Sequence, residues 1–275
     1  MLNRASRSEL HGIDTTESAA VWCEIRDAAA AIASTEAILA PYLRATILQR
    51  DSLAAAISQL LAAKVSVPQV EQDSTRALFE QILTQDGDLI EVITCDLKAA
   101  VERDPAAHGI IDVFLNHKGF HALESFRIAH WLWTEHRTAL ALHLQSRISE
   151  VFAVDIHPAC SIGRGIFIDH GTGVVIGETT VIADDVSILQ GVTLGGTGKE
   201  VGDRHPKIAQ GVLICAGAKV LGNIRVGTAS KVGAGSVVLD DVPERTTVAG
   251  VPARIVGRPK EESPALTMNV RVDDG

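Results

Sequence analysis

Acidic and basic side chains that could do chemistry gather in two short stretches of the second half of the chain. Asp169 and His170 are adjacent, and a second stretch reads Asp203-Arg-His-Pro-Lys207. A neutral histidine can remove a proton from a hydroxyl group, and a carboxylate can orient that histidine. An arginine can hold a carboxylate with two hydrogen bonds. These residue types suit acid–base chemistry on a charged substrate.

The spacing of the histidines does not match a metal site. His157, His170 and His205 are widely spread in the sequence. None of them has a close histidine partner of the kind that zinc sites use. We therefore predict that the protein binds no metal.

The second half of the chain is a repeat with a period of six residues. This period fits neither an amphipathic helix nor one long strand, but it fits short strands separated by turns, with each aliphatic side chain pointing into a narrow prism. The sequence therefore predicts a left-handed parallel β-helix of hexapeptide repeats. The aliphatic position recurs, with one shift of phase and one longer interruption, at Ile156, Ile162, Ile168, Ile176, Ile182, Ile188, Leu194, Ile208, Ile214, Val220, Val226, Val232 and Val238.

The interruption of the repeat lies between Leu194 and Ile208. These residues are fourteen positions apart, two more than two hexads would take. The residues between them are polar and rich in glycine, so they do not suit the inside of a prism. We expect one protruding loop here. Loops on a rigid scaffold often carry binding residues.

The first half of the chain has a different composition. Only four of the 23 glycines precede residue 151, whereas only two of the ten aromatic residues follow residue 150. Ala, Leu, Glu and Arg at helical spacing predict amphipathic helices. The expected fold class is α+β: an N-terminal α-helical domain at 1–150 with about residues 1–14 disordered, a β-helix domain at 151–258, and a flexible C-terminal tail at 259–275. No linker separates the two domains, so we expect them to dock directly.

Charge and hydropathy exclude several classes of protein. The net charge of −9 argues against a nucleic-acid binder. The first twenty residues lack the apolar core of a signal peptide, and no run of about 18 apolar residues could span a membrane. The four cysteines stand far apart without a CxxC pair, which argues against a disulfide framework and suits a reducing compartment. We expect a cytoplasmic protein.

Eight stretches of this chain resemble the serine O-acetyltransferases, a family within the hexapeptide-repeat acyltransferases. The resemblance covers roughly residues 15 to 260, and the helical domain together with the loop makes it narrower than the repeat alone. The matching stretches are Lys118-Gly-Phe-His-Ala-Leu, Val154-Asp-Ile-His-Pro, Asp169-His170, Ile176-Gly-Glu-Thr, Val186-Ser-Ile-Leu-Gln, Leu194-Gly-Gly-Thr-Gly-Lys, Asp203-Arg-His-Pro-Lys and Ala249-Gly-Val-Pro-Ala-Arg.

The resemblance implies the transfer of an acetyl group from acetyl-CoA to the hydroxyl of L-serine, giving O-acetyl-L-serine and CoA at the start of cysteine biosynthesis. It makes His170 the general base and Asp155 its partner, and it adds His205 to the catalytic group. Asp155 and His170 are fifteen residues apart. One coil of this fold has roughly 18 residues by the resemblance, so we expect the two side chains to lie near each other.

The two charges of serine require binding groups of opposite charge. By the resemblance, Arg204 holds the carboxylate, with His205 beside it. Asp169 and Asp104 hold the ammonium group, with Asp104 coming from the helical domain. Glu178 matches another active-site position of the family, whose role we leave open.

The resemblance places acetyl-CoA, as a co-substrate, along the coils of the β-helix. From Lys199 to Lys260 the chain has ten basic and five acidic residues, which suits the phosphates of CoA. Small residues would give the pantetheine arm room to pass. The residues so assigned are Gly196, Thr197, Ala216 and Ala234, with Lys231 nearby.

The resemblance also implies partners. L-cysteine should inhibit by competing with serine, because it offers the same ammonium and carboxylate groups. The chain should form a homo-oligomer, either a trimer with sites between neighbouring solenoids or a dimer of trimers joined through the helical domains. Many family members end in an isoleucine that enters O-acetylserine sulfhydrylase. This sequence ends in Asp273, Asp274 and Gly275 without such an apolar residue, so we expect weak binding or none.

Other functions fit parts of the sequence. Another hexapeptide acetyltransferase could act on a sugar or antibiotic hydroxyl with the same base histidine, although such enzymes lack this helical domain. A β-helix metalloenzyme of the carbonic anhydrase kind would need three histidines on zinc. A purely structural solenoid would release no CoA in the presence of serine.

Overall fold

The first half of the molecule is a set of packed helices. A computed structural model describes residues 15–198 and 201–272, so the disorder expected for residues 1–14 lies outside the described part. The helices are α1 (Thr15–Thr35), α2 (Ala40–Leu43), the short π-helix η2 (Arg44–Leu48), α3 (Leu53–Val65), α4 (Gln72–Gln85), α5 (Gly87–Arg103), α6 (Ile110–Asn116), α7 (Lys118–Thr134) and α8 (Thr138–Phe152).

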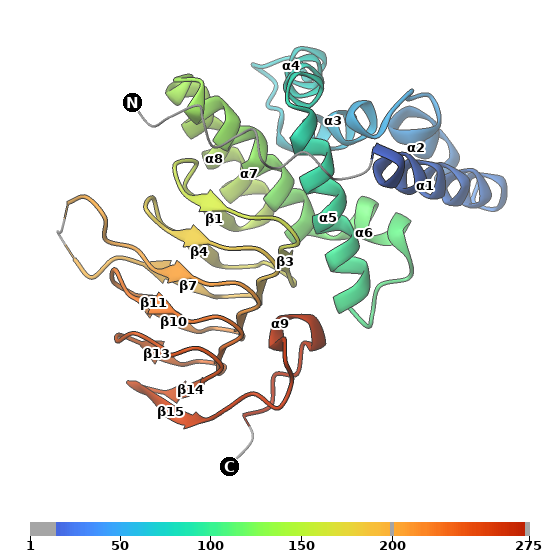
Figure 1. The fold of residues 1–275 in the computed structure, drawn as a ribbon. Coiled ribbons are helices and arrows are strands. Elements are labelled where there is room, and N and C mark those ends of the chain that lie inside the picture. The colour runs from blue at the N-terminus through green and yellow to red at the C-terminus, as the bar shows by residue number, and fades with distance from the viewer. Residues whose placement is uncertain (1–14, 199–200, 273–275) are drawn as a thin grey trace.

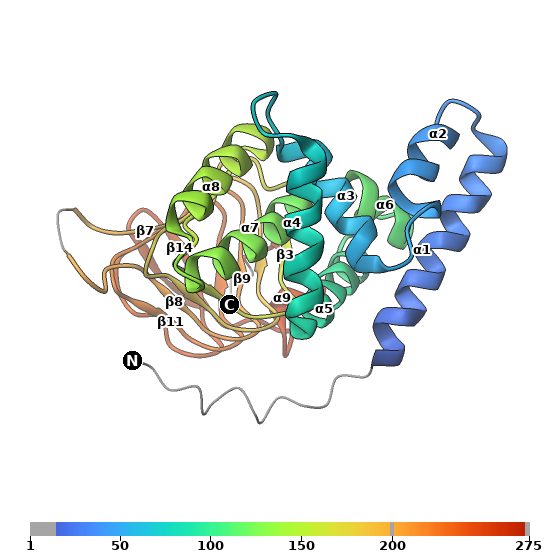
Figure 2. The same cartoon turned by 90° about the horizontal axis from the view of Figure 1, so that it is seen from above.

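Local sequence explains how these helices begin and pack. Ser52 caps α3 by accepting a hydrogen bond from the backbone N–H of Ala55 at 3.2 Å. In α4 the apolar residues Phe79, Ile82 and Leu83 lie at helical spacing and are buried. Figure 2 shows that α7 and α8 lie over the end of the second half of the molecule, while α1 and α2 lie farther out.

The second half is a parallel β-solenoid with three faces, as Figure 1 shows. The first face contains β1 (Val154–Ile156), β4 (Val174–Ile176), β7 (Thr193–Gly195), β10 (Lys219–Leu221) and β13 (Val237–Val238). The second face contains β2 (Ser161–Ile162), β5 (Val181–Ile182), β8 (Lys207–Ile208) and β11 (Arg225–Val226). The third face contains β3 (Phe167–Ile168), β6 (Ser187–Ile188), β9 (Leu213–Ile214), β12 (Lys231–Val232), β14 (Thr247–Gly250) and the antiparallel β15 (Ala253–Gly257).

The period of six predicts this arrangement because each coil contributes one short strand to each face. On the first face, Ile176 pairs with Leu194, and Leu194 pairs with Val220. All three side chains are at most 2% exposed, so the aliphatic position of each hexad forms the continuous core of the prism. The predicted α+β architecture, with a helical domain followed by a parallel β-solenoid, is confirmed.

One coil carries the predicted loop. Leu194 lies on the first face and Ile208 begins the next hexad on the second face, whereas a regular step such as Ile176 to Ile182 takes six residues. One regular step accounts for six of the fourteen residues, so eight residues belong to the loop. The sequence count allowed for two hexads between these positions and so left only two extra residues. Figure 1 shows the loop protruding from the solenoid, with residues 199–200 outside the described part.

The two halves dock directly, and a buried ion pair of the helical half forms hydrogen bonds with the backbone of the solenoid. The Arg127 guanidinium of α7 donates to Asp96 of α5 at 2.7 Å and to the carbonyl of Gly163 in the solenoid, also at 2.7 Å. Asp96 in turn accepts the backbone N–H of Ile166 at 2.7 Å. Helix α8 extends past the boundary expected at residue 150 and ends at Phe152. Only Ala153 lies between this helix and β1.

The C-terminal segment corrects a prediction. The sequence favours a flexible tail from residue 259, yet residues 264–267 form the short helix α9 (Pro264–Thr267), which packs on the third face with Ala265 fully buried. Ser187 of β6 donates a hydrogen bond to the carbonyl of Ala265 at 2.8 Å. The polar composition of this segment concealed a few apolar residues that are enough to anchor it.

Candidate active site

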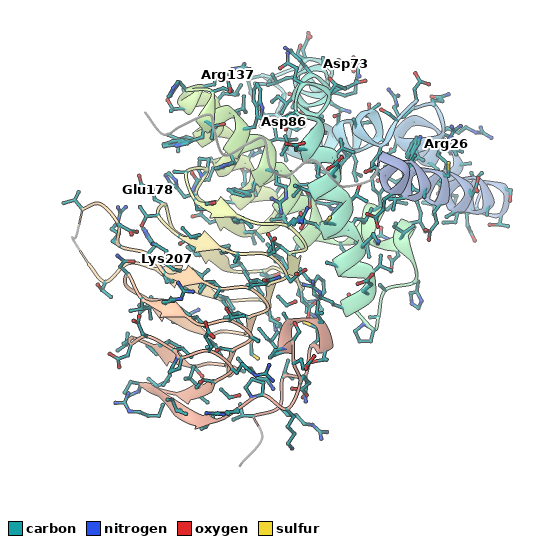
Figure 3. All side chains as sticks on the ribbon, in the orientation of Figure 1. Arg26, Asp73, Asp86, Arg137, Glu178 and Lys207 are labelled. Atoms are coloured by element: carbon teal, nitrogen blue, oxygen red, sulfur yellow. The ribbon has the colours of Figure 1, made fainter. Side chains whose placement is uncertain are left out.

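Most of the predicted site residues lie at or beside two different corners of the prism, whereas Asp155 and Lys231 lie on strands. The corner between the third and first faces, here called the His170 corner, contains the turn 169–173 and the turns 215–218 and 233–236 stacked below it. The corner between the first and second faces, here called the His205 corner, contains the turns 157–160 and 177–180 and the protruding loop. Figure 3 shows Glu178 and Lys207 at the His205 corner, on the side from which the loop extends.

His170 is the most exposed of the site histidines. Its side chain is 74% exposed, and its Nε2 atom lies 3.8 Å from Oδ1 of Asp169. The residue has a left-handed backbone with φ of 55°, a conformation that costs energy for a residue with a side chain. The turn therefore holds the imidazole outward from the prism.

Helix α7 supports this turn from behind. Gly119 lies so close to the turn that a Cβ atom there would come within 2.0 Å of the Ile168 carbonyl oxygen. Lys118 also donates a hydrogen bond to the hydroxyl of Thr172. The Lys118-Gly119 pair of the sequence is thus the point at which the helical domain fixes the position of His170.

Two carboxylates meet beside His170, as predicted. Asp104 follows the end of α5, and Asp169 precedes the histidine on the solenoid. Burial raises the pKa of Asp169, and the Asp104 carboxylate raises it further, while His170 opposes both effects. Two adjacent carboxylates form a site of concentrated negative charge that suits an ammonium group.

His117 is a member of this corner that sequence reasoning missed. Its Nδ1 atom lies 3.7 Å from Asp104, and its Nε2 atom lies 3.8 Å from Asp112. The signal was present, because His117 directly precedes the matched Lys118 stretch, but nothing in the spacing linked it to Asp104.

Asp155 and His170 do not occupy equivalent positions in successive coils. The first coil has 20 residues, so Asp155 pairs with Val175 on the next strand. Its Oδ1 atom accepts a hydrogen bond from Gln145 of α8 at 2.8 Å. The backbone N–H of Gly173 donates to the Ala153 carbonyl at 2.7 Å, which joins the His170 turn to the chain just before Asp155. The fifteen-residue spacing is therefore not the reason for any contact between Asp155 and His170.

At the His205 corner the side chains are held tightly. Arg204 donates to Glu178 at 2.7 Å, and this hydrogen bond keeps the pKa of Glu178 low despite partial burial. His205 is only 7% exposed. Burial lowers the pKa of His205, and the neighbouring Arg204 charge adds to the effect, so the imidazole is neutral at neutral pH.

Gly177 makes room for the His205 ring. A Cβ atom at Gly177 would lie 2.1 Å from Cδ2 and from Nε2 of His205. No side chain fits in that space, so the glycine in the Ile176-Gly-Glu-Thr stretch is required for the ring to pack where it does. His157, at the same corner, packs edge-on against Trp133 with ring centroids 5.3 Å apart.

The residues assigned to acetyl-CoA are divided between the corners. Ala216 and Ala234 occupy the turns stacked below His170, where the backbone N–H of Gly235 donates to the Ala216 carbonyl at 2.8 Å. Gly196 and Thr197 begin the loop at the other corner.

Lys231, which the resemblance places near acetyl-CoA, is buried in this structure. It is 1% exposed, and its Nζ atom donates to the Arg271 carbonyl at 3.0 Å and lies 4.0 Å from Glu261. The C-terminal segment that sequence reasoning left free covers this lysine, and the assignment of Lys231 to acetyl-CoA stays a prediction.

Within one chain the two corners stay apart. No contact between His170 and His205 exists among the residues that the structure describes. The two corners lie at opposite ends of the strands of the first face. These strands therefore separate the Asp104–Asp169–His170 group from the Arg204–His205 group. In residues 15–198 and 201–272, no group of three or more His, Cys, Asp or Glu side chains could hold a metal ion.

Comparisons with known proteins point in one direction. Residues 21–125 match the family model described as "Serine acetyltransferase, N-terminal". The chain is 53% identical over 249 residues to a serine acetyltransferase of Salmonella typhimurium, covering 90% of this chain and 91% of that one.

Solved structures agree with the sequence matches. A serine acetyltransferase in complex with cysteine superposes with a TM-score of 0.91 at 51% identity, covering 93% of this chain and 100% of that one. A serine acetyltransferase of Brucella abortus in complex with coenzyme A superposes with a TM-score of 0.85 at 50% identity, covering 87% of this chain and 96% of that one.

Proposed function

The chain belongs to the serine acetyltransferase family, and from that premise we propose how its residues divide the reaction between the two corners. The enzyme transfers the acetyl group of acetyl-CoA to the hydroxyl of L-serine, and O-acetyl-L-serine and CoA are the products. This division of roles is based on one observation. The His170 corner exposes a histidine beside two carboxylates, while the His205 corner holds a neutral histidine beside an arginine.

The His170 corner carries the base. His170 removes the proton of the serine hydroxyl as the oxygen attacks the acetyl carbonyl carbon. When the carbon–sulfur bond breaks, the same proton passes to the sulfur of CoA. Asp155 serves this imidazole as the partner that steadies its positive charge, a role that comes from the family motif alone. Asp104 and Asp169 hold the serine ammonium group, and their shared negative charge supports this role.

The His205 corner carries the complementary charge. Arg204 holds the serine carboxylate, and its guanidinium, which Glu178 orients, remains about a quarter exposed. His205 stands beside it as a neutral hydrogen-bond donor. Acetyl-CoA binds as the co-substrate along Ala216, Ala234, Gly196 and Thr197, a role to which the coenzyme A complex of the Brucella relative lends support.

We propose that a complete site forms between two copies of the chain. Serine is too short to reach across the whole first face, so its ammonium and carboxylate partners must come from different solenoids. Three copies around an axis would bring the His170 corner of one copy against the His205 corner of the next. Two such trimers could join through the helical domains into a hexamer.

L-cysteine fits the same site, because it differs from serine only by sulfur in place of oxygen. The cysteine complex of a relative supports feedback inhibition of this enzyme. The cytoplasm is the proposed compartment, since the cysteines at positions 23, 95, 160 and 215 are free thiols. No described helix is long and apolar enough to cross a membrane.

A panel of acceptors tests the substrate assignment. Release of CoA is measured with L-serine and with sugar and aminoglycoside hydroxyls, each at several concentrations of L-cysteine. We expect turnover with serine alone, and inhibition by cysteine that rising serine overcomes. Preference for a sugar hydroxyl, or cysteine inhibition that saturating serine leaves unchanged, would contradict the proposal.

A further inference from the structure

One threonine, Thr179, forms hydrogen bonds with three residues of the His205 corner, Arg204, His205 and Lys207. Thr179 lies in the turn that follows β4, while Arg204 and His205 lie at the end of the protruding loop. The Thr179 hydroxyl oxygen accepts the backbone N–H groups of Arg204 at 3.0 Å and of His205 at 3.1 Å. The Thr179 carbonyl accepts a hydrogen bond from Lys207 at 2.8 Å.

The same threonine contacts the imidazole of His205 twice. Its backbone N–H donates to Nδ1 of His205 at 3.2 Å, and its hydroxyl oxygen lies 2.9 Å from that nitrogen. A backbone N–H can only donate, so Nδ1 must be the unprotonated nitrogen of the ring. The threonine hydroxyl oxygen already accepts two N–H groups and has no lone pair left for a proton on Nδ1. Its own proton can point toward Nδ1 or toward the carboxylate of Asp203.

The opposite arrangement of protons is unfavourable. A proton on Nδ1 would face the N–H of Thr179, and the threonine oxygen would have to accept a third hydrogen bond. Burial and the Arg204 charge lower the pKa of His205, so the ring does not carry both protons at neutral pH. The proton of the neutral ring therefore resides on Nε2.

We infer that Thr179 is the positioning residue that fixes His205 as a neutral hydrogen-bond donor through Nε2. Nε2 lies on the side of the ring for which Gly177 leaves space. This assignment gives the two histidines of the enzyme distinct roles, since a ring fixed in this way donates to a negative group and does not accept a proton from serine. It rests on the proposed function only for its effect on the rate, because the tautomer itself is a property of the single chain.

Three variants separate the role of Thr179 from a general loss of packing. Thr179→Val removes the hydroxyl and keeps the shape, and Thr179→Ser restores the hydroxyl. The matched control is Thr180→Val: Thr180 is the next residue, is 1% exposed, and its hydroxyl has no hydrogen-bond partner in the described part of the chain. Thr180→Val should therefore behave like the native enzyme in every assay.

The direct readout is nitrogen NMR of the full-length enzyme labelled with ¹⁵N-histidine, with the His205 signals assigned from a His205→Gln variant. In the native enzyme we expect an unprotonated Nδ1 and a protonated Nε2. In Thr179→Val the hydroxyl no longer anchors the backbone N–H groups of Arg204 and His205, so the ring can move away from the N–H of residue 179. We therefore expect a mixture of tautomers, a pKa of His205 closer to its ordinary value, and a kcat lower by roughly tenfold with little change in the KM for acetyl-CoA. Thr179→Ser should restore both the spectrum and the rate.

The outcomes distinguish this inference from the proposed function. A proton on Nδ1 in the native enzyme, or a Thr179→Val spectrum identical to the native one, would overturn the role of Thr179 whatever happens to the rate. A changed spectrum with an unchanged rate supports the role of Thr179 and contradicts the participation of His205 in the reaction.

Discussion

The two corners of the prism hold their histidines in opposite ways. The His205 corner is complete within one chain: the ring is 7% exposed, and hydrogen bonds from Thr179 orient it. The His170 corner is open: its histidine side chain is 74% exposed, and the groups around it come from both the solenoid and the helical domain. One corner is preorganised by its own chain, and the other presents a histidine to whatever lies outside that chain.

This difference between an open and a closed corner indicates how such a solenoid can form an active site. A regular prism separates its corners, so a small substrate cannot touch two of them in one copy. A site that needs a base from one corner and an arginine from another is therefore best assembled from two copies. Substitutions at one corner can therefore be tested separately from substitutions at the other.

The largest effect should come from the open corner. Loss of a general base typically costs about 10²- to 10⁴-fold in rate. His170→Ala should therefore lower kcat by that factor, while acetyl-CoA affinity, measured by calorimetry, changes little. Near-normal turnover in this variant would remove His170 from the role of base.

At the closed corner, a single added methyl group should be nearly as damaging. Gly177→Ala places a Cβ atom 2.1 Å from the His205 ring, so the ring must move. A misplacement of about 1 Å can cost up to about 10²-fold in kcat/KM. Gly87→Ala is the control, because a Cβ atom there meets no other atom within 4 Å. Equal activity of the two variants would show that the position of His205 is unimportant.

Asp104 tests whether the helical domain contributes to serine binding. Asp104→Asn removes a charge next to Asp169 and should raise the KM for serine roughly 10- to 100-fold, the value of a hydrogen bond to a charged group. Steady-state kinetics with varied serine measures it. Asp112→Asn is the control, because Asp112 contacts the other nitrogen of His117. A similar rise in both variants would assign the effect to His117 instead.

The smallest effect should come from the Glu178–Arg204 pair, which is partly exposed. The hydrogen bond from Arg204 lowers the pKa of Glu178, so the pair stabilises the fold above the ordinary glutamate pKa. That contribution is lost as the pH falls through the lowered value. Glu178→Gln should therefore reduce the free energy of unfolding by less than about 1 kcal/mol near neutral pH, and by less still in acid. Urea unfolding at several pH values measures this, and a difference that grows in acid would reverse the assigned sign.

The fold could be predicted in large part because a period of six has one physical solution. The aliphatic positions from Ile176 to Val238 stack as the hexads require, and the polar stretch before Ile208 forms the loop. The period does not reveal the length of each coil. The first coil has 20 residues, so the spacing argument for Asp155 and His170 fails even though their family assignment stays a prediction.

The features that sequence reasoning missed depend on contacts between residues distant in sequence. Lys231 is buried because Arg271 and the segment around Ala265 fold back over the third face. His117 and Thr179 were missed because their importance lies in what they touch, Asp104 and His205, and no motif or spacing encodes those contacts. Residue types and the family resemblance supplied the candidate site residues, and the structure separates the Asp104–Asp169–His170 group from the Arg204–His205 group.

A mixing experiment tests most directly whether the site is shared between copies. His170→Ala and His205→Ala chains are purified separately, then unfolded and refolded together in equal amounts. If each site takes His170 from one copy and His205 from the next, a random mixture of trimers regains intact sites at about a quarter of the native number. We expect that recovery of activity in the mixture, relative to each variant refolded alone. Mixed trimers, verified by mass spectrometry, that are no more active than the separate variants would contradict it.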